Sequence, residues 1–136
     1  MSTKHIVIVD DLRSPINGQF HVEPGCTVHI ARDCQSARDL LETLAGDGPV
    51  LAALYLDHDL GIGPDGQLHT IFPLVDLLVD RALQCSPINV GEVIVHTSNP
   101  VGRDRIVAAL TTARIAGCYN VRVADAAAVG LAVSPV

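Results

Sequence analysis

Five short segments of the chain have the hydrophobic pattern of β-strands. Val50–Leu56 is apolar throughout and ends abruptly at Asp57-His58-Asp59, which is typical of a strand buried in a parallel sheet. The other segments are His5–Val9, Thr27–Ala31, Glu92–Val95 and Tyr119–Val123. We therefore predict five strands, with Val50–Leu56 at the centre of the fold.

Three segments between these strands carry apolar residues at helical spacing. Each follows a residue that favours the N-cap position and precedes a helix-stopping residue. The expected cap and stop are Asp33 and Gly46 for the first helix, Thr70 and Ser86 for the second, and Asn99 and Gly117 for the third. Pro100 is well placed as the first residue of the third helix.

The remaining segments lack a clear period. Leu12–Gly25 predicts a long loop, and its part Gln19–Gly25 has no assigned role. Gly61–Gly66 is either a mobile flap or a surface turn, and Asp125–Val136 is either a short helix or a docked tail. Strands that alternate with helices predict one α/β domain over residues 1–136, a three-layer sandwich with a five-stranded parallel sheet.

Composition narrows the classes of function. Of the 136 residues 49% are hydrophobic and only 3% aromatic, so the core must be aliphatic. No stretch approaches the ~18 apolar residues of a membrane span, and we expect a cytoplasmic protein without a membrane partner. The net charge of −6 disfavours a broad nucleic-acid surface, although a local basic patch can still hold one phosphate. The oligomeric state, including a homodimer, is left open.

Polar clusters follow three of the predicted strands, and parallel strands bring their carboxyl ends to one edge. The clusters are Asp10-Asp11, Asp57-His58-Asp59 and His96-Thr97-Ser98-Asn99. Grouped carboxylates repel one another, and a divalent cation bound by oxygen ligands, Mg²⁺ or Mn²⁺, relieves that repulsion. The alternative is that one carboxyl group stays protonated. We predict a metal held by Asp10, Asp11 and Asp57, with Asp59 in support.

The same edge has features that suit a phosphate. The helix expected at Pro100 points its free N–H groups there, and Arg103 lies in its first turn. Thr97, Ser98 and Asn99 add further polar groups, so phosphoryl chemistry is the expectation. The imidazoles of His58 and His96 are candidates for acid and base catalysis. Structural hydrogen bonding is the alternative for each histidine, and an ordinary surface position is the alternative for Arg103.

With these residues placed, the chain resembles a response-regulator receiver domain. Asp10-Asp11 matches the metal-binding carboxylates, Asp57 the phospho-acceptor, and Thr97 or Ser98 the switch hydroxyl. The chain departs from this pattern in two ways. A loop is expected in place of the first helix, and the lysine that receivers carry after the last strand is missing, because the only lysine is Lys4.

A closer resemblance is to the cyclic-phosphate processing receiver domains, a receiver-like family. The matching motifs are Asp10 to Pro15, Leu56 to Gly61 (LDHDLG) and Val95 to Arg103 (VHTSNPVGR), and the resemblance extends from Ile6 to about Leu110. It implies a phosphohydrolase that acts on a cyclic or terminal phosphate.

Two classes of function follow from these observations. The first is a Mg²⁺- or Mn²⁺-dependent phosphoesterase that acts on a cyclic or terminal phosphate of a nucleotide or RNA end. His58 and His96 would then supply acid and base, while Ser98, Asn99 and Arg103 would bind the phosphate with Thr97 beside them. The second is a non-enzymatic module that signals as a receiver or binds a phosphorylated ligand. Turnover of substrate separates the two.

Overall fold

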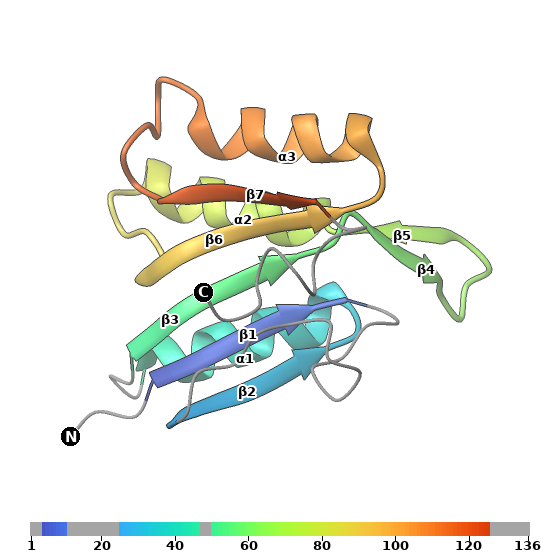
Figure 1. The fold of residues 1–136 in the computed structure, drawn as a ribbon, viewed down its shortest axis with the longest axis horizontal. Helices are drawn as coiled ribbons and strands as arrows, with labels where there is room; N and C mark the ends of the chain where they lie inside the picture. The colour runs from blue at the N-terminus through green and yellow to red at the C-terminus, as the bar shows by residue number, and fades with distance from the viewer. Residues whose placement is uncertain (1–3, 11–24, 47–49, 126–136) are drawn as a thin grey trace.

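A five-stranded parallel sheet forms the centre of the protein (Figure 1). The computed structural model describes residues 4–10, 25–46 and 50–125. The strands are β1 (Lys4–Val9), β2 (Cys26–Ala31), β3 (Val50–Leu56), β6 (Val90–Thr97) and β7 (Val121–Asp125). Their order across the sheet is β2-β1-β3-β6-β7, and every neighbouring pair is parallel. All five carboxyl ends therefore lie along one edge.

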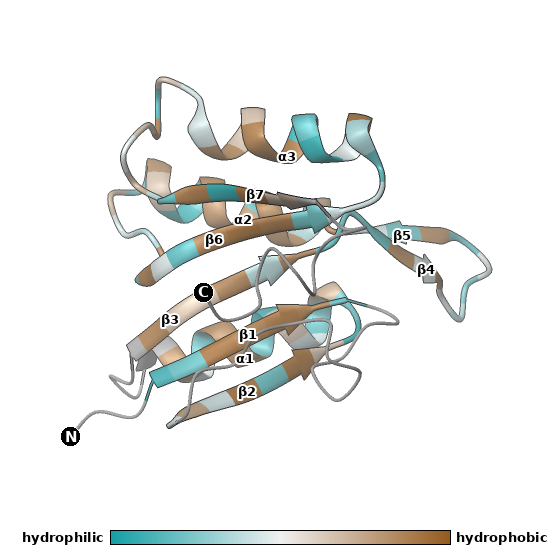
Figure 2. Ribbon diagram, viewed as in Figure 1, coloured by the Kyte–Doolittle hydropathy of each residue, from teal (hydrophilic) through white to brown (hydrophobic). Residues whose placement is uncertain are grey.

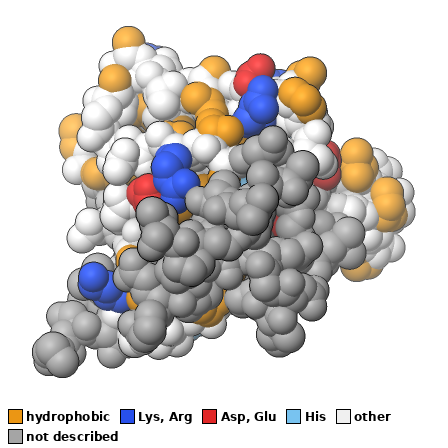
Figure 3. Space-filling view, in the orientation of Figure 1, with side chains coloured by type: hydrophobic (Ala, Val, Ile, Leu, Met, Phe, Trp, Pro, Cys, Tyr) orange, Lys and Arg blue, Asp and Glu red, His pale blue; other side chains and the backbone are white. Residues whose placement is uncertain are grey.

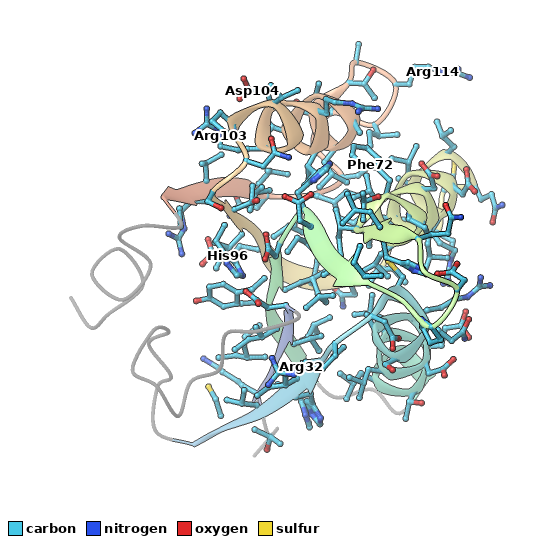
Figure 4. The ribbon with its side chains drawn as sticks, turned by 90° about the vertical axis from the view of Figure 1, so that its right-hand side faces the viewer. Arg32, Phe72, His96, Arg103, Asp104 and Arg114 are labelled. Carbon is cyan, nitrogen blue, oxygen red and sulfur yellow. The ribbon has the colours of Figure 1, made fainter. Side chains whose placement is uncertain are left out.

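The three described helices cover one face of this sheet, as the side view in Figure 4 makes clear. They are α1 (Cys34–Gly46), α2 (Phe72–Leu83) and α3 (Pro100–Thr111). Their buried residues form one core with alternate residues of the central strands, which include Val9, Leu56 and Val95. The core is aliphatic, as the composition requires, and Figure 2 shows the hydrophobic colour along β1, β3 and β6.

The other face of the sheet carries a second, smaller apolar cluster. Ile8, Tyr55, Ile94 and Ala124 are buried there, each from a different strand. Because side chains alternate between the two faces of a strand, the next residues on this second face are those two positions further along. For β1, β3 and β6 those positions are Asp10, Asp57 and His96.

One element departs from the sequence prediction. The region predicted as a flap or turn at Gly61–Gly66 is the tip of a two-stranded antiparallel hairpin, β4 (Asp59–Ile62) and β5 (Leu68–Thr70). The hairpin extends beyond the edge of the main sheet (Figure 1). Its strands are only four and three residues long, and glycine, proline and aspartate dominate its turn, which hides the period-two pattern from sequence analysis.

Helix ends also differ from prediction in two places. α2 begins at Phe72 with Ile71 as its N-cap residue, while the Thr70 hydroxyl accepts a 3.4 Å hydrogen bond from the Phe72 amide. α3 ends at Thr111, well before Gly117, whose φ of 89° belongs to the turn that follows.

The last strand is displaced from the predicted Tyr119–Val123 to Val121–Asp125. Tyr119 lies before it, buried, with its hydroxyl donating to the Leu78 carbonyl. This bond ties the α3–β7 connection to α2, so the tyrosine is used for packing between elements and not for strand pairing.

The predicted receiver-like α/β fold with a five-stranded parallel sheet is confirmed. Of the three layers predicted, the described residues provide the sheet and the helices on one face. The predictions for Asp11, for the loop Gln19–Gly25 up to residue 24, and for the tail after Asp125 lie outside the described residues. None of the described helices is long and apolar enough to cross a membrane.

Candidate functional site at the carboxyl edge of the sheet

A row of polar side chains lies one residue beyond the positions at which the three central strands last pair with one another. β6 itself continues past the predicted end at Val95, because His96 pairs with Ala124 of β7. Val9 pairs with Leu56, and Leu56 pairs with Val95. The hydrogen bonding between β1 and β3 reaches this row, since the Asp57 amide donates to the Val9 carbonyl at 3.1 Å. Asp10, Asp57 and His96 are thus neighbours on the second face of the sheet. We call these three residues the strand-end row.

The strand-end row is buried. Asp10 is 1% exposed, Asp57 8% and His96 0%. Nδ1 of His96 lies 3.9 Å from Oδ2 of Asp10. The ring of Tyr55 meets the His96 ring edge-on at 5.6 Å, and burial raises the pKa of Tyr55 to about 12. Buried ionisable groups in close contact are a common property of functional sites.

One charged residue at this edge was missed by sequence analysis. Arg32 follows β2 directly, and its Nη1 donates a 3.0 Å hydrogen bond to the main-chain carbonyl of Asp10. It brings a positive charge beside the strand-end row (Figure 4). Its position in the sequence could have revealed it, because Arg32 directly follows a strand, as Asp10 and Asp57 do.

A second set of contacts joins the end of β3 to the start of α3. Nδ1 of His58 lies 2.9 Å from Oδ1 of Asp59. The side-chain amide of Asn99 lies 3.4 Å from both His58 Nδ1 and Asp59 Oδ2. Asn99 also uses its Oδ1 to accept from the Gly102 amide at 3.0 Å. Asn99 therefore caps α3, as predicted, and its Nδ2 atom reaches back to His58 and Asp59.

The glycine at position 102 makes this contact sterically feasible. A Cβ atom there would overlap the His58 ring, so the histidine fills the space that a side chain would occupy. Phe72 meets the other side of the His58 ring edge-on at 5.7 Å, and Arg105 lies 5.1 Å above the Phe72 ring. His58 is thus packed between α2 and α3, away from the second face that carries His96.

The turn that leads into α3 presents few free amides. Thr97 Oγ1 accepts from the Asn99 amide at 3.2 Å, and the Asn99 carbonyl accepts from the Arg103 amide at 2.9 Å. Because Pro100 has no N–H and Gly102 bonds to Asn99, the Val101 amide is the one left in this first turn to meet an anion. Ser98 is exposed at the same turn.

Arg103 lies at the α3 end of the edge in Figure 4. Its Nε donates to the carboxylate of the adjacent Asp104 at 3.2 Å. That ion pair is partly solvent-exposed, so it holds Arg103 weakly and leaves the guanidinium able to turn.

The donor atoms fit a hydrated divalent cation. Asp10 and Asp57 offer carboxylate oxygens, which Mg²⁺ and Mn²⁺ prefer, and Mg²⁺ often takes only one or two carboxylates beside water and phosphate. No group of three or more His, Cys, Asp or Glu side chains within the described ranges is arranged to hold a metal ion. The predicted third ligand, Asp11, lies outside those ranges. Asp59 contacts His58 and Asn99.

The sequence-predicted residues thus separate into two groups. Asp10, Asp57 and His96 form the strand-end row on the second face. The other group surrounds the start of α3 and comprises His58, Asp59, Thr97, Asn99 and, at its rim, Ser98 and Arg103. His96 and His58 lie at neighbouring strand ends but in different environments.

Comparison with known proteins agrees with this architecture. The sequence model of one family, described as the cyclic-phosphate processing receiver domain, matches residues 5–112. That match includes both groups of site residues. No curated protein matches the chain, and neither does any solved structure. Because the match covers most of its length, the chain belongs to the cyclic-phosphate processing receiver domain family.

Proposed function

We propose that this domain is a phosphoesterase that hydrolyses a cyclic or terminal phosphate of a nucleotide or RNA end. The observation that carries the proposal is the strand-end row: two carboxylates and an imidazole side by side on one face of the sheet. The start of α3 borders the same edge and supplies groups of the kind that bind phosphate.

In this proposal Asp10 and Asp57 hold Mg²⁺ or Mn²⁺, with Asp11 as the further ligand. When bound, such an ion offsets the charge of the phosphate and makes a bound water more acidic. The bound ion would also reduce the repulsion between the two carboxylates, which otherwise opposes their burial.

His96 is the first candidate for proton transfer. A carboxylate 3.9 Å from Nδ1 favours the tautomer with its proton on that nitrogen. Nε2 is then the atom that accepts a proton from water or returns one to the leaving oxygen. Asp10 would have two tasks, as a metal ligand and as the group that orients His96.

His58 is the second candidate, and its surroundings suggest a more constrained role. Its Nδ1 faces Asp59 and Asn99, and its ring is clamped between Gly102 and Phe72. Such packing suits a residue that positions the turn before α3, with only Nε2 left for acid or base work. Ser98, Thr97, Asn99 and Arg103 are the proposed phosphate ligands.

A non-enzymatic module that binds a phosphorylated ligand is the competing function. Its support is the complete burial of His96, because a catalytic imidazole must reach its substrate. Phosphorylation as in signalling receivers is disfavoured, since Lys4 begins β1 at the edge opposite Asp57. A bound ligand without turnover would favour this alternative.

The deciding experiment is a substrate screen with the purified protein. Cyclic nucleotides, RNA with a 2′,3′-cyclic end and phosphomonoesters are each incubated with Mg²⁺ or Mn²⁺, and products are followed by chromatography. We expect hydrolysis of at least one cyclic or terminal phosphate, and its loss in Asp57→Asn. Tight binding without hydrolysis of any of them would replace the phosphoesterase with the binding module.

A further inference from the structure

A cleft of about 360 Å³ lies between the β4–β5 hairpin and the turn that joins β2 to α1. The described residues that line it include Arg32 and Gln35 on one side and Leu60, Ile62, Pro64 and His69 on the other. Because the hairpin that forms one wall was not predicted from the sequence, the cleft could not be predicted either. No role assigned above uses it.

Arg32 links the cleft to the strand-end row. Arg32 lines the cleft and donates a hydrogen bond to the Asp10 carbonyl at 3.0 Å. Leu60, in the opposite wall, is two residues beyond His58, whose carbonyl accepts from the Ile71 amide at 2.9 Å. Both walls are therefore anchored to the ends of strands that form the site.

The lining suits a flat, partly polar group. Leu60, Ile62 and Pro64 give it an apolar surface, while the Gln35 amide and the His69 imidazole are polar. Ile62 is 68% exposed, a large apolar side chain left open to water on a strand. Figure 3 shows apolar side chains gathered on the hairpin at the right of the molecule. A ring stacked on this surface would remove it from water.

We propose that the cleft binds the sugar and base of a single nucleoside whose phosphate lies at the strand-end row. This inference rests on the proposed function, and it names the substrate class as a mononucleotide or the last nucleotide of an RNA end. The volume is near the lower limit of small-molecule sites, which run from ~300 to ~1,000 Å³. A cleft of this volume holds one nucleoside and is too small for several nucleosides.

The test compares substrates with and without the nucleoside. Glycerol 1,2-cyclic phosphate has the same five-membered cyclic phosphate as the four nucleoside 2′,3′-cyclic monophosphates but no ribose or base. With Mg²⁺ present, we expect at least one nucleotide to exceed the glycerol compound in kcat/KM by about tenfold or more. An RNA with the same terminal nucleotide should gain nothing further.

Two pairs of variants locate the effect. Ile62 and its register partner Leu68 are similarly exposed, at 68% and 62%, but only Ile62 lines the cleft. Ile62→Ala should raise KM for the preferred nucleotide about fivefold, and Leu68→Ala should not. Gln35→Trp, which places a large side chain in the cleft, should raise this KM more than about tenfold. Glu42→Trp, at an exposed position two turns further along α1, serves as its control. None of these four variants should change kcat/KM for glycerol 1,2-cyclic phosphate.

The outcomes separate the two proposals. Equal kcat/KM with and without the nucleoside, or equal effects of Ile62→Ala and Leu68→Ala, would overturn the nucleoside site and leave the phosphoesterase intact. If neither a cyclic nor a terminal phosphate is hydrolysed, the phosphoesterase fails, and calorimetry with nucleoside 2′- and 3′-monophosphates then decides the nucleoside site. Binding no tighter than that of inorganic phosphate would refute it.

Discussion

Nδ1 of His96 lies 3.9 Å from Oδ2 of Asp10, although β3 stands between the strands that carry the two residues. The side chains approach each other across the position of Asp57 in the middle strand. The three side chains therefore meet at one buried place on the second face of the sheet. This proximity makes the strand-end row the first target for mutation.

Replacing His96 with alanine should lower kcat by about 10²–10⁴ if its Nε2 transfers a proton, because that is the usual cost of losing a positioned acid or base. His58→Ala should lower kcat by a smaller factor. Steady-state kinetics on the active cyclic phosphate measure both, with circular dichroism to confirm folding. His5→Ala is the control, since His5 lies near the opposite end of β1. Wild-type turnover in folded His96→Ala and His58→Ala would make both histidines structural.

A divalent cation should stabilise the protein by linkage if Asp10 and Asp57 bind it in the folded state only. We expect millimolar Mg²⁺ or Mn²⁺ to raise the melting temperature by about 3–5 °C. Asp57→Asn should abolish the increase, while Asp76→Asn, on the exposed side of α2, should keep it. Identical melting curves with and without metal would remove the metal site from the proposal.

Small phosphodonors should not label Asp57 stably. Receivers carry a lysine after the last strand, and the only lysine of this chain, Lys4, stands at the amino end of β1, whereas Asp57 follows the carboxyl end of β3. Mass spectrometry after incubation with acetyl phosphate and Mg²⁺ should detect no lasting adduct. A stoichiometric adduct sensitive to hydroxylamine, absent in Asp57→Asn, would instead favour signalling by phosphorylation.

Because His58 packs on Gly102, the effect of Gly102→Ala on the free energy of unfolding should depend on whether His58 is present. Alanine normally stabilises a helix by about 0.5–1 kcal/mol over glycine. Gly102→Ala should nevertheless lower the free energy of unfolding, since the new Cβ overlaps the His58 ring. In a His58→Ala background the same change should be neutral or stabilising. Urea denaturation of the four proteins gives the coupling, and equal effects in both backgrounds would contradict the contact.

Both tyrosines should ionise at a higher pH than a solvent-exposed tyrosine does. Burial raises the pKa of Tyr55 to about 12, and the pKa of Tyr119 is also raised by burial. Between the ordinary pKa near 10 and about 12 the unfolded chain ionises Tyr55 while the folded chain does not, so stability should fall as pH rises through this window. In Tyr119→Phe, absorbance of tyrosinate should report Tyr55 alone. Ionisation near pH 10 with intact circular dichroism would show that the Tyr55 phenol is solvated.

The sequence predicted the ends of β1 and β3 well because they depend on local signals. An apolar run of strand length followed by an aspartate marks both a buried strand and its end, as at Val9-Asp10 and Leu56-Asp57. Asn99 was likewise predictable as the cap of α3, because its side chain bonds to an amide only three residues away. The hairpin was missed since its strands are short and pair only with each other.

The sequence by itself therefore determined the five-stranded α/β fold, the edge at which the polar residues gather and the family. Only the tertiary structure decided how those residues are divided. Strand register places His96 with Asp10 and Asp57 on one face, and helix packing places His58 with Asp59 and Asn99 under α3. Register and packing are long-range properties, set by contacts between residues some forty positions apart, and no local pattern encodes them.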